Sequence, residues 1–159
     1  SHQSMFETFF LQTIFNSPVF ILKKELLKIP IFGWYLKKIG SISIERNKTT
    51  KENLGFFDEI LKLINSSNRP LIIFPQGTRL TPDDRSPFKK GASRIYEELK
   101  IKCQPVAINS GYTWPKKGLL IPKKILTVSI LKPIESGINK EIFLKTLQEN
   151  IYLELDSLN

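Results

Sequence analysis

The sequence predicts an α/β domain with a mostly parallel central sheet flanked by helices. Three observations support this fold class. Short apolar runs of strand length alternate along the chain with longer segments of helical spacing, and polar or proline-containing turns separate them. The chain has 159 residues, of which 41% are hydrophobic, so it is long enough to bury a core of its own.

Five apolar runs have the length of strands. The run at 40–46 alternates between apolar and polar residues, which is typical of a half-buried strand, whereas the runs at 19–22 and 71–74 are continuously apolar. Since these runs alternate with helical segments, we expect most of the strands to be parallel. The expected strands cover residues 19–22, 40–46, 71–74, 104–109 and 125–131.

Apolar residues at helical spacing predict four helices. The first is apolar nearly all round, so we expect it to be buried or to touch lipid. Residues 26–39 mix aromatic residues and lysines around Pro30 and Gly33, which predicts short helical turns in place of one long helix. The expected helices cover residues 5–15, 52–65, 88–99 and 141–158.

The net charge of +9 is unevenly distributed, because eight of the lysines and arginines lie within residues 23–51. A basic patch suits nucleic acid, an anionic membrane surface or a phosphorylated substrate, but it can also be a solvated face that only keeps the protein soluble. Two aromatic residues, Trp34 and Tyr35, are followed by Lys37 and Lys38. This pattern fits a bilayer interface, and it fits an ordinary alternation of core and surface positions about as well.

The chain contains one cysteine, Cys103, and one histidine, His2. One cysteine excludes an intramolecular disulfide and a cysteine-based metal cluster, and we expect Cys103 to be a small buried residue. A zinc site would need mostly carboxylate ligands, so we expect no metal site.

His2 is the natural candidate for a general base, because an unperturbed imidazole titrates near neutral pH. Glu7 lies five residues further on, and on a straight helix the two side chains would point about 140° apart. They can meet only if His2 precedes a helix and Glu7 lies in its first turn, as the capping-box pattern of Ser4 and Glu7 predicts. Glu7 could then orient the imidazole. On these residues alone, the favoured interpretation is that Glu7 only caps the helix and that His2 is an unstructured terminal residue.

A second candidate site follows the expected strand at 71–74, where the chain continues as Pro75-Gln76-Gly77-Thr78-Arg79. Glycine lets backbone approach a ligand, threonine donates a hydrogen bond, and arginine binds phosphate with two parallel bonds. The pattern is not a nucleotide P-loop, and an ordinary turn after a strand would look the same. Arg46 follows the expected strand at 40–46, at the end where α/β sheets bind ligands.

Taken in order, these blocks resemble the glycerolipid acyltransferases, most closely the bacterial lysophosphatidate acyltransferases. The family pattern His-x-x-x-x-Asp is matched by His2 to Glu7, and its Gly-x-Ile-x-Ile-x-Arg strand by residues 40–46. Its Phe-Pro-Glu-Gly-Thr-Arg block is matched by residues 74–79, and its apolar strand with proline by residues 105–107. The resemblance therefore covers nearly the whole chain.

The resemblance implies site residues and a reaction. His2 would be the catalytic base, oriented by Glu7, and would remove the proton from the sn-2 hydroxyl of lysophosphatidate, whose oxygen then attacks an acyl thioester to give phosphatidate. Arg79, Thr78, Gly77 and Arg46 would hold the acceptor phosphate, and Pro105 would shape the acyl site. The implied substrate-binding residues are Lys24, Arg46, Gln76, Gly77, Thr78, Arg79 and Pro105.

Two positions depart from the family pattern. Glu7 stands where the family has Asp, which adds one methylene to the pair. Gln76 stands where the third block has Glu, and since a glutamine side chain is never an ionised acid, no base role is assigned to it.

The resemblance also implies partners and a location. The expected partners are lysophosphatidate, an acyl thioester carried by acyl-CoA or acyl-carrier protein, and an anionic membrane surface, with no nucleic acid and no cofactor. We expect a membrane-associated enzyme of phospholipid biosynthesis at the cytoplasmic face of the inner (plasma) membrane. Because no residue precedes His2 but Ser1, we expect residues 1–159 to be an acyltransferase domain lacking its N-terminal strand and any membrane-anchoring helix.

Two other interpretations remain open at the level of sequence. The chain could acylate another acceptor, such as glycerol 3-phosphate or an aminolipid. It could also be a non-catalytic basic module that binds lipid or nucleic acid, although that interpretation leaves the 74–79 block without a purpose and no stacking-aromatic RNA motif is present.

Overall fold

The computed structural model describes residues 1–44 and 54–158, which form two compact units. Unit 1 comprises Ser1–Phe9 and Phe74–Asn159, and unit 2 comprises Phe10–Ile73. Helix α1 (Phe6–Ile14) begins in unit 1 and ends in unit 2. Arg46, one of the predicted phosphate-binding residues, lies outside the described residues.

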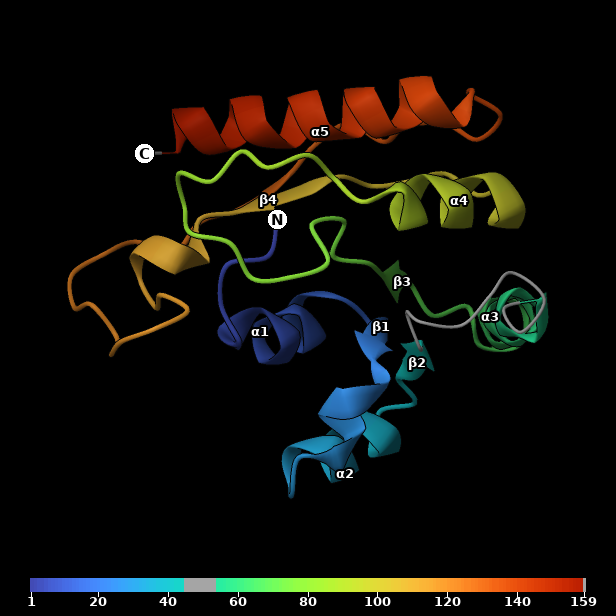
Figure 1. Ribbon diagram of the computed structural model, residues 1–159, viewed down its shortest axis with the longest axis horizontal. Coiled ribbons are helices and arrows are strands. Elements are labelled where there is room, and N and C mark those ends of the chain that lie inside the picture. The colour runs from blue at the N-terminus through green and yellow to red at the C-terminus, as the bar shows by residue number, and fades with distance from the viewer. Residues whose placement is uncertain (45–53, 159) are drawn as a thin grey trace. The chain divides into compact units, whose positions relative to one another are not determined.

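Unit 2 is built on a parallel sheet with the strand order β2–β1–β3 (Figure 1). The central strand β1 (Val19–Lys23) pairs with β2 (Ile42–Ile44) on one side and with β3 (Leu71–Ile72) on the other. Branched and aromatic side chains favour this half- or fully buried position, and Val19 and Phe20 are completely buried.

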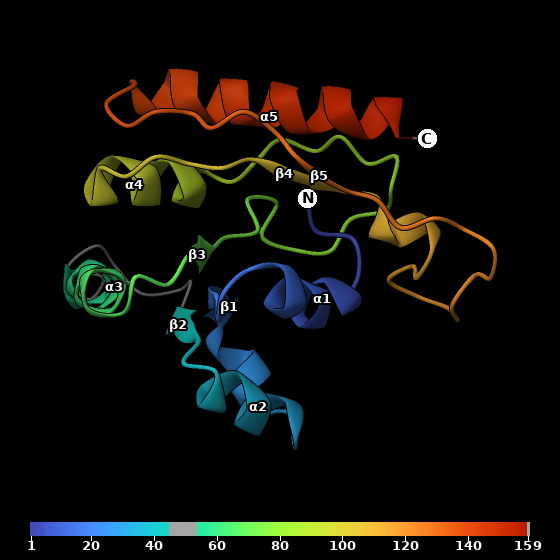
Figure 2. The ribbon, with the colours of Figure 1, turned by 180° about the vertical axis from the view of Figure 1, so that it is seen from behind.

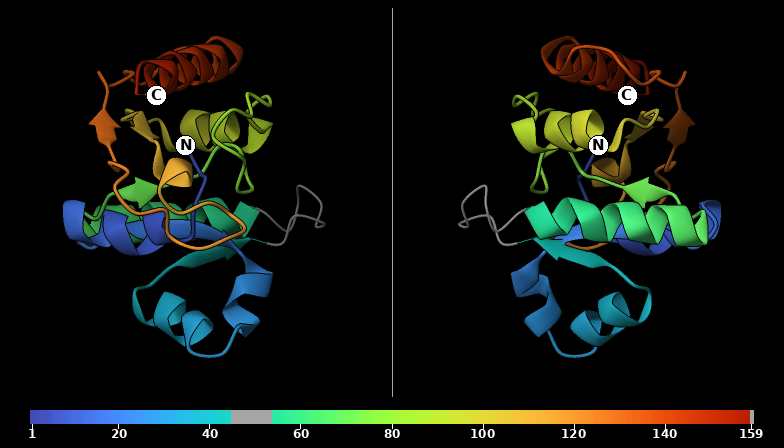
Figure 3. Two further views of the ribbon diagram at one scale, coloured as in Figure 1. Left: turned by 90° about the vertical axis from the view of Figure 1, so that its left-hand side faces the viewer. Right: turned by 90° about the vertical axis from the view of Figure 1, so that its right-hand side faces the viewer.

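Short helices connect the strands of unit 2. The 3₁₀ helix η1 (Lys24–Lys28) and helix α2 (Phe32–Lys38) form the crossover from β1 to β2 (Figure 3), and helix α3 (Leu54–Ser67) precedes β3. A Cβ atom on Gly33 would lie 2.2 Å from the Leu27 carbonyl oxygen, so only glycine lets α2 approach η1 this closely.

Arg69 holds the start of β1 to the end of α2. Its guanidinium donates to the carbonyl oxygens of Ser17 and Ile39, each at 2.5 Å, and to that of Pro18 at 3.4 Å. The arginine thus supplies charged donors to three carbonyl oxygens that lie in two separate segments of unit 2.

Unit 1 contains the antiparallel strands β4 (Val106–Ile108) and β5 (Val128–Ile130), which Figure 2 shows beside each other. Helices α4 (Lys90–Leu99) and α5 (Lys140–Ser157) pack against one another, and α5 also contacts β4 (Figure 1). Between them Tyr96 and Phe143 stack with ring centroids 3.7 Å apart. The short 3₁₀ helix η2 (Ser110–Tyr112) follows β4.

The predicted α/β fold class is confirmed. The strands β2, β1 and β3 form a parallel sheet, and helices alternate with the strands along the chain. The prediction that residues 26–39 form short helical turns is also confirmed. The strands expected at 104–109 and 125–131 pair with each other in antiparallel fashion, in a second sheet. A parallel pair needs a long crossover, usually helical, whereas residues 113–127 form a loop that lets the chain reverse.

Cys103 differs from expectation because it is only half-buried, although burial still raises the pKa of its thiol to about 11. Among residues 1–44 and 54–158, no helix has both the length and the apolar character needed to cross a bilayer.

Candidate active site

The first turn of α1 positions the candidate catalytic pair. Ser4 Oγ accepts a hydrogen bond from the Phe6 backbone N–H at 3.2 Å, and Glu7 Oε1 accepts one from the Ser4 N–H at 3.0 Å. This reciprocal arrangement is a capping box, as the sequence predicts. It fixes the side chain of Glu7 beside the residues that precede the helix.

His2 and Glu7 meet through a short hydrogen bond. His2 Nδ1 lies 2.5 Å from Glu7 Oε2, and the Glu7 side chain is fully buried, whereas that of His2 is 17% exposed. Since an ionised carboxylate only accepts hydrogen bonds, this contact places the proton on Nδ1. Nε2 is then the ring nitrogen that can accept a proton.

The second oxygen of Glu7 is held by three donors from two distant parts of the chain. Oε1 accepts from the backbone N–H groups of Gln3 at 2.7 Å and Ser4 at 3.0 Å, and from the hydroxyl of Ser110. All three bonds are buried. With its two oxygens so occupied, the carboxylate can hold the imidazole in one orientation and one tautomer.

The loop that carries the third sequence block packs around His2. The imidazole stacks on the ring of Phe74 at a centroid distance of 4.0 Å, and the His2 carbonyl oxygen accepts from the Leu80 N–H at 3.0 Å. Between these residues the chain turns where the Gly77 N–H donates to the Phe74 carbonyl oxygen at 2.9 Å. Gly77 has a φ of +70°, which glycine adopts without strain.

The predicted phosphate-binding residues follow that turn. Gly77 and Arg79 are half-buried, and Thr78 is exposed. The structure therefore brings residues 76–79 into the same loop that contacts His2 at both of its ends.

Gln76 lies in the same loop and is buried. Its side-chain oxygen has no hydrogen-bond partner within the described part of the chain. Burial raises the pKa of Tyr152, and a hydrogen bond to Gln76 opposes that shift. The Gln76 side chain therefore has a buried oxygen that could accept a hydrogen bond, and as an amide it cannot act as an acid or a base.

Strand β4 holds Ser1, the residue that precedes His2 in the chain. The Ser1 nitrogen donates to the Val106 carbonyl oxygen at 2.9 Å, and Ser1 Oγ bonds both the N–H and the carbonyl oxygen of Ile108, at 2.9 and 2.8 Å. Pro105, predicted to shape the acyl site, stands directly before this strand with its side chain fully buried. Lys24 is an exposed residue at the start of η1 in unit 2.

Three residues of the site were not predicted from the sequence: Gln3, Phe74 as the stacking partner, and Ser110. The Gln3 side-chain oxygen accepts from the Gly111 N–H at 2.9 Å, next to the Ser110 bond to Glu7. A signal for Ser110 existed, because it follows the carboxyl end of an expected strand, the same rule that singled out Arg46.

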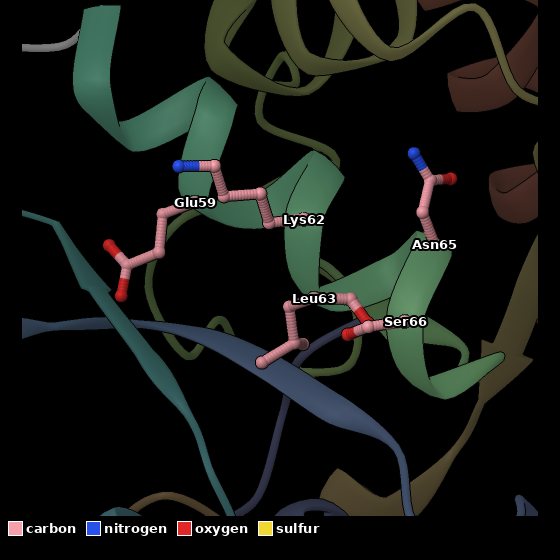
Figure 4. Close-up of a pocket in the computed structure, with 5 residues that line it drawn as sticks. All are labelled: Glu59, Lys62, Leu63, Asn65 and Ser66. Carbon is pink, nitrogen blue, oxygen red and sulfur yellow. The ribbon is translucent and has the colours of Figure 1, made fainter.

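A shallow depression elsewhere lies along one face of α3 in unit 2 (Figure 4). It is lined by Glu59, Lys62, Leu63, Asn65 and Ser66. These side chains include no nucleophile paired with a base, so we assign no chemistry to it. No group of three or more His, Cys, Asp or Glu residues within 1–44 and 54–158 is arranged to hold a metal ion.

The geometry of unit 1 suits general-base chemistry on a hydroxyl group. It combines a partly exposed imidazole, a buried carboxylate that orients it, and an adjacent loop with glycine, threonine and arginine. Such a base typically contributes about 10²–10⁴-fold in rate.

Comparison with known proteins gives a matching result. A family model described as "Acyltransferase" matches residues 1–109, which include every motif block of the chain. The 1-acyl-sn-glycerol-3-phosphate acyltransferase of Pseudomonas aeruginosa is 36% identical over 120 residues, covering 74% of this chain and 45% of that protein. The enzyme of the same name from Helicobacter pylori is 33% identical over 157 residues, covering 97% of this chain and 65% of that protein.

The fold has a solved counterpart. The crystal structure of the 1-acyl-sn-glycerophosphate acyltransferase of Thermotoga maritima superimposes with a TM-score of 0.76 at 23% identity, covering 99% of this chain and 64% of that one. This likeness supports the α/β fold class. The chain thus spans between 45% and 65% of the length of these three relatives.

Proposed function

The chain belongs to the acyltransferase family, and on this premise we propose that it transfers a fatty acyl group to the sn-2 hydroxyl of 1-acyl-glycerol-3-phosphate, giving phosphatidate. The donor is acyl-CoA or acyl-carrier protein. The observation that carries the proposal is the contact of 2.5 Å between His2 and the buried carboxylate of Glu7, which leaves Nε2 to act on a hydroxyl. The names of the relatives from Pseudomonas aeruginosa and Helicobacter pylori support this acceptor.

The proposed reaction first makes a carbon–oxygen bond at the acyl carbon and then breaks the carbon–sulfur bond there. His2 Nε2 takes the proton of the sn-2 hydroxyl while Nδ1–H stays bonded to Glu7, and the oxygen attacks the thioester carbonyl carbon. The tetrahedral intermediate carries its negative charge on the former carbonyl oxygen. As it collapses, the carbon–sulfur bond breaks, and His2 returns the proton to the thiolate sulfur.

Residues of the 76–79 loop are proposed to bind the acceptor. Arg79 suits a phosphate because its planar guanidinium can form two parallel hydrogen bonds, Thr78 adds a hydroxyl, and Gly77 lets the backbone of the loop approach the ligand. Gln76 can offer its unpartnered buried acceptor to a substrate hydroxyl. Lys24 remains a proposed substrate-binding residue, Arg46 a proposed phosphate contact, and Pro105 a proposed part of the acyl site.

The proposed setting is an anionic membrane surface at the cytoplasmic face of the plasma membrane. Lysophosphatidate carries one acyl chain and a phosphate, so it is presented at a lipid–water interface. The excess of basic residues, which gives a net charge of +9, favours such a surface.

A thiol-release assay tests the proposal. Release of free thiol from palmitoyl-CoA is followed with and without lysophosphatidate in mixed micelles, and the lipid extract is analysed for phosphatidate. The wild-type chain should release thiol only with the acceptor. His2→Gln, whose amide can still bond Glu7 but cannot act as a base, should lose at least about 10²-fold in kcat.

Four outcomes would contradict the proposal. Release that does not need an acceptor, or that survives in both His2→Gln and His2→Ala, would refute the role of His2. A faster reaction with glycerol 3-phosphate or an aminolipid than with lysophosphatidate would refute the acceptor while retaining the chemistry. Absence of release from palmitoyl-CoA and from palmitoyl carrier protein alike would refute the enzymatic function of this chain.

A further inference from the structure

The segment between η2 and β5 presents apolar side chains to solvent. Leu119 is 88% exposed and Ile125 is 81% exposed, while Leu120 and Ile121 are 59% and 41% exposed. Exposed branched apolar residues this close together in the chain are unusual on the surface of a soluble domain. We call residues 114–125 the Leu-Lys loop.

The charge of the Leu-Lys loop has one sign. Two pairs of exposed lysines, 116–117 and 123–124, flank its apolar centre, and the loop contains no acidic residue. The next acid along the chain is Glu135. A partner that fits this loop is therefore anionic at its surface and apolar just beneath.

The base of the Leu-Lys loop is fixed to the candidate active site. The ring of Trp114 lies 6.1 Å from that of Phe6, the residue before Glu7, and Lys116 Nζ donates to the Arg79 carbonyl oxygen at 3.1 Å. The Ile121 N–H donates to the Thr113 carbonyl oxygen at 2.7 Å, which closes the loop at its base. In Figure 1 the loop, drawn in orange, extends away from η2.

We propose that the Leu-Lys loop docks unit 1 on an anionic lipid bilayer, with Leu119, Leu120 and Ile125 inserted among the lipids and the lysines at the headgroup phosphates. The inference rests on the proposed function for the choice of lipid as the partner. The position of the contact is inferred from the exposure and charge of the Leu-Lys loop alone.

A bilayer explains the loop better than a protein partner does. The apolar side chains are exposed to solvent, and a bilayer receives exposed apolar side chains without needing a complementary shape. Lysines on both sides of the apolar centre match the interfacial position of headgroup phosphates. Because an irregular loop leaves backbone groups that need water, it can enter only to the depth of the interface and not into the hydrocarbon core.

Docking at this point would serve the proposed reaction. Because Trp114 and Lys116 contact the residues next to Glu7 and within the 74–80 loop, a loop seated in the interface would hold His2 near the lipid surface. The acceptor would then reach the base without leaving the bilayer fully.

Vesicle partitioning tests the proposal. The chain is prepared in a Trp34→Phe background so that Trp114 is its single tryptophan, and its binding is measured by co-sedimentation with vesicles of phosphatidylcholine alone or with phosphatidylglycerol. Three variants are compared: Leu119→Ser with Leu120→Ser, all four loop lysines to Gln, and Leu153→Ser. The last is the matched control, because Leu153 on α5 is 68% exposed and lies outside the loop.

The double leucine variant should partition about 10- to 100-fold more weakly into both kinds of vesicle, because two exposed apolar side chains no longer enter the lipid. The lysine variant should lose binding only to the anionic vesicles, and the wild-type affinity should fall with added salt. The Leu153 variant should bind as the parent does. Trp114 emission should shift to shorter wavelength on binding in the parent and in the control.

The proposal is overturned if the loop variants partition like the parent, or if the parent does not partition at all. It is also overturned if the variants keep vesicle binding but lose binding to an acidic carrier protein, which would make the loop a protein-docking surface. Thiol release in detergent micelles separates this inference from the proposed function. Loop-dependent vesicle binding without any acyl transfer would refute the function and leave the docking surface standing.

Discussion

Replacing Glu7 by glutamine separates the charge of this residue from its shape. Each oxygen of the carboxylate now accepts hydrogen bonds: Oε2 from His2 Nδ1 at 2.5 Å, and Oε1 from the backbone N–H groups of Gln3 and Ser4 and from the Ser110 hydroxyl. An amide has only one oxygen, so its NH₂ group must face either His2 or this group of donors.

The cheaper arrangement turns the amide NH₂ toward His2. In the opposite arrangement the NH₂ group would face two backbone donors and a hydroxyl. Each buried donor left without an acceptor costs about 1–3 kcal/mol. An NH₂ group opposite Nδ1 forces the imidazole into the tautomer with its proton on Nε2, which can no longer act as a base. We expect kcat to fall about 10²–10⁴-fold with little change in KM.

The assay is thiol release at saturating lysophosphatidate, accompanied by thermal unfolding. Glu149→Gln, an exposed acid-to-amide change on α5 that removes only an ion pair at 3.8 Å with Lys145, is the control and should keep full activity. Glu7→Asp should lose less, about tenfold, because a shorter side chain keeps its charge but moves away from one of its partners. A Glu7→Gln chain that is folded and has kcat within threefold of the parent would refute the orienting role of the carboxylate.

Four further predictions concern other parts of the chain. Ser110→Ala should lower kcat about tenfold and Ser110→Thr should restore it, because a hydroxyl there holds Glu7; equal rates in thiol release for all three chains would contradict this. Arg69→Ala should lower the free energy of unfolding in urea by about 2–3 kcal/mol, because three carbonyl oxygens lose a charged donor; an unchanged midpoint would contradict this. Phe143→Ala should cost about 3–5 kcal/mol in the same measurement, because the ring is buried against Tyr96, and a loss below 1 kcal/mol would show that the site collapses. Alkylation of Cys103 by iodoacetamide at pH 8 should be about a hundredfold slower than that of a thiol with a pKa of 9.0, and should keep accelerating as the pH rises toward 11, because burial raises the pKa of this thiol to about 11 and so reduces its thiolate fraction; a rate that levels off near pH 9 would contradict this.

Local sequence determined the features whose causes are local. Ser4 and Glu7 lie within one helical turn, so the capping box and with it the approach of Glu7 to His2 followed from seven consecutive residues. The helices and most strands followed from the spacing of apolar residues, which reflects the repeat of each kind of backbone. The order of the motif blocks was enough to identify the family, because residue types at fixed spacings require no coordinates.

Tertiary structure decided what depends on residues far apart in the chain. Ser110 reaches Glu7 across 103 positions, and Phe74 stacks on His2 across about 70, distances at which spacing carries no information. Likewise the sequence could not tell whether β4 and β5 would pair with each other, since strand propensity does not specify a partner. Leu119 and Ile125 have the composition of core residues, and only the packed structure leaves them in solvent, because burial is a property of the whole fold and not of the residue type.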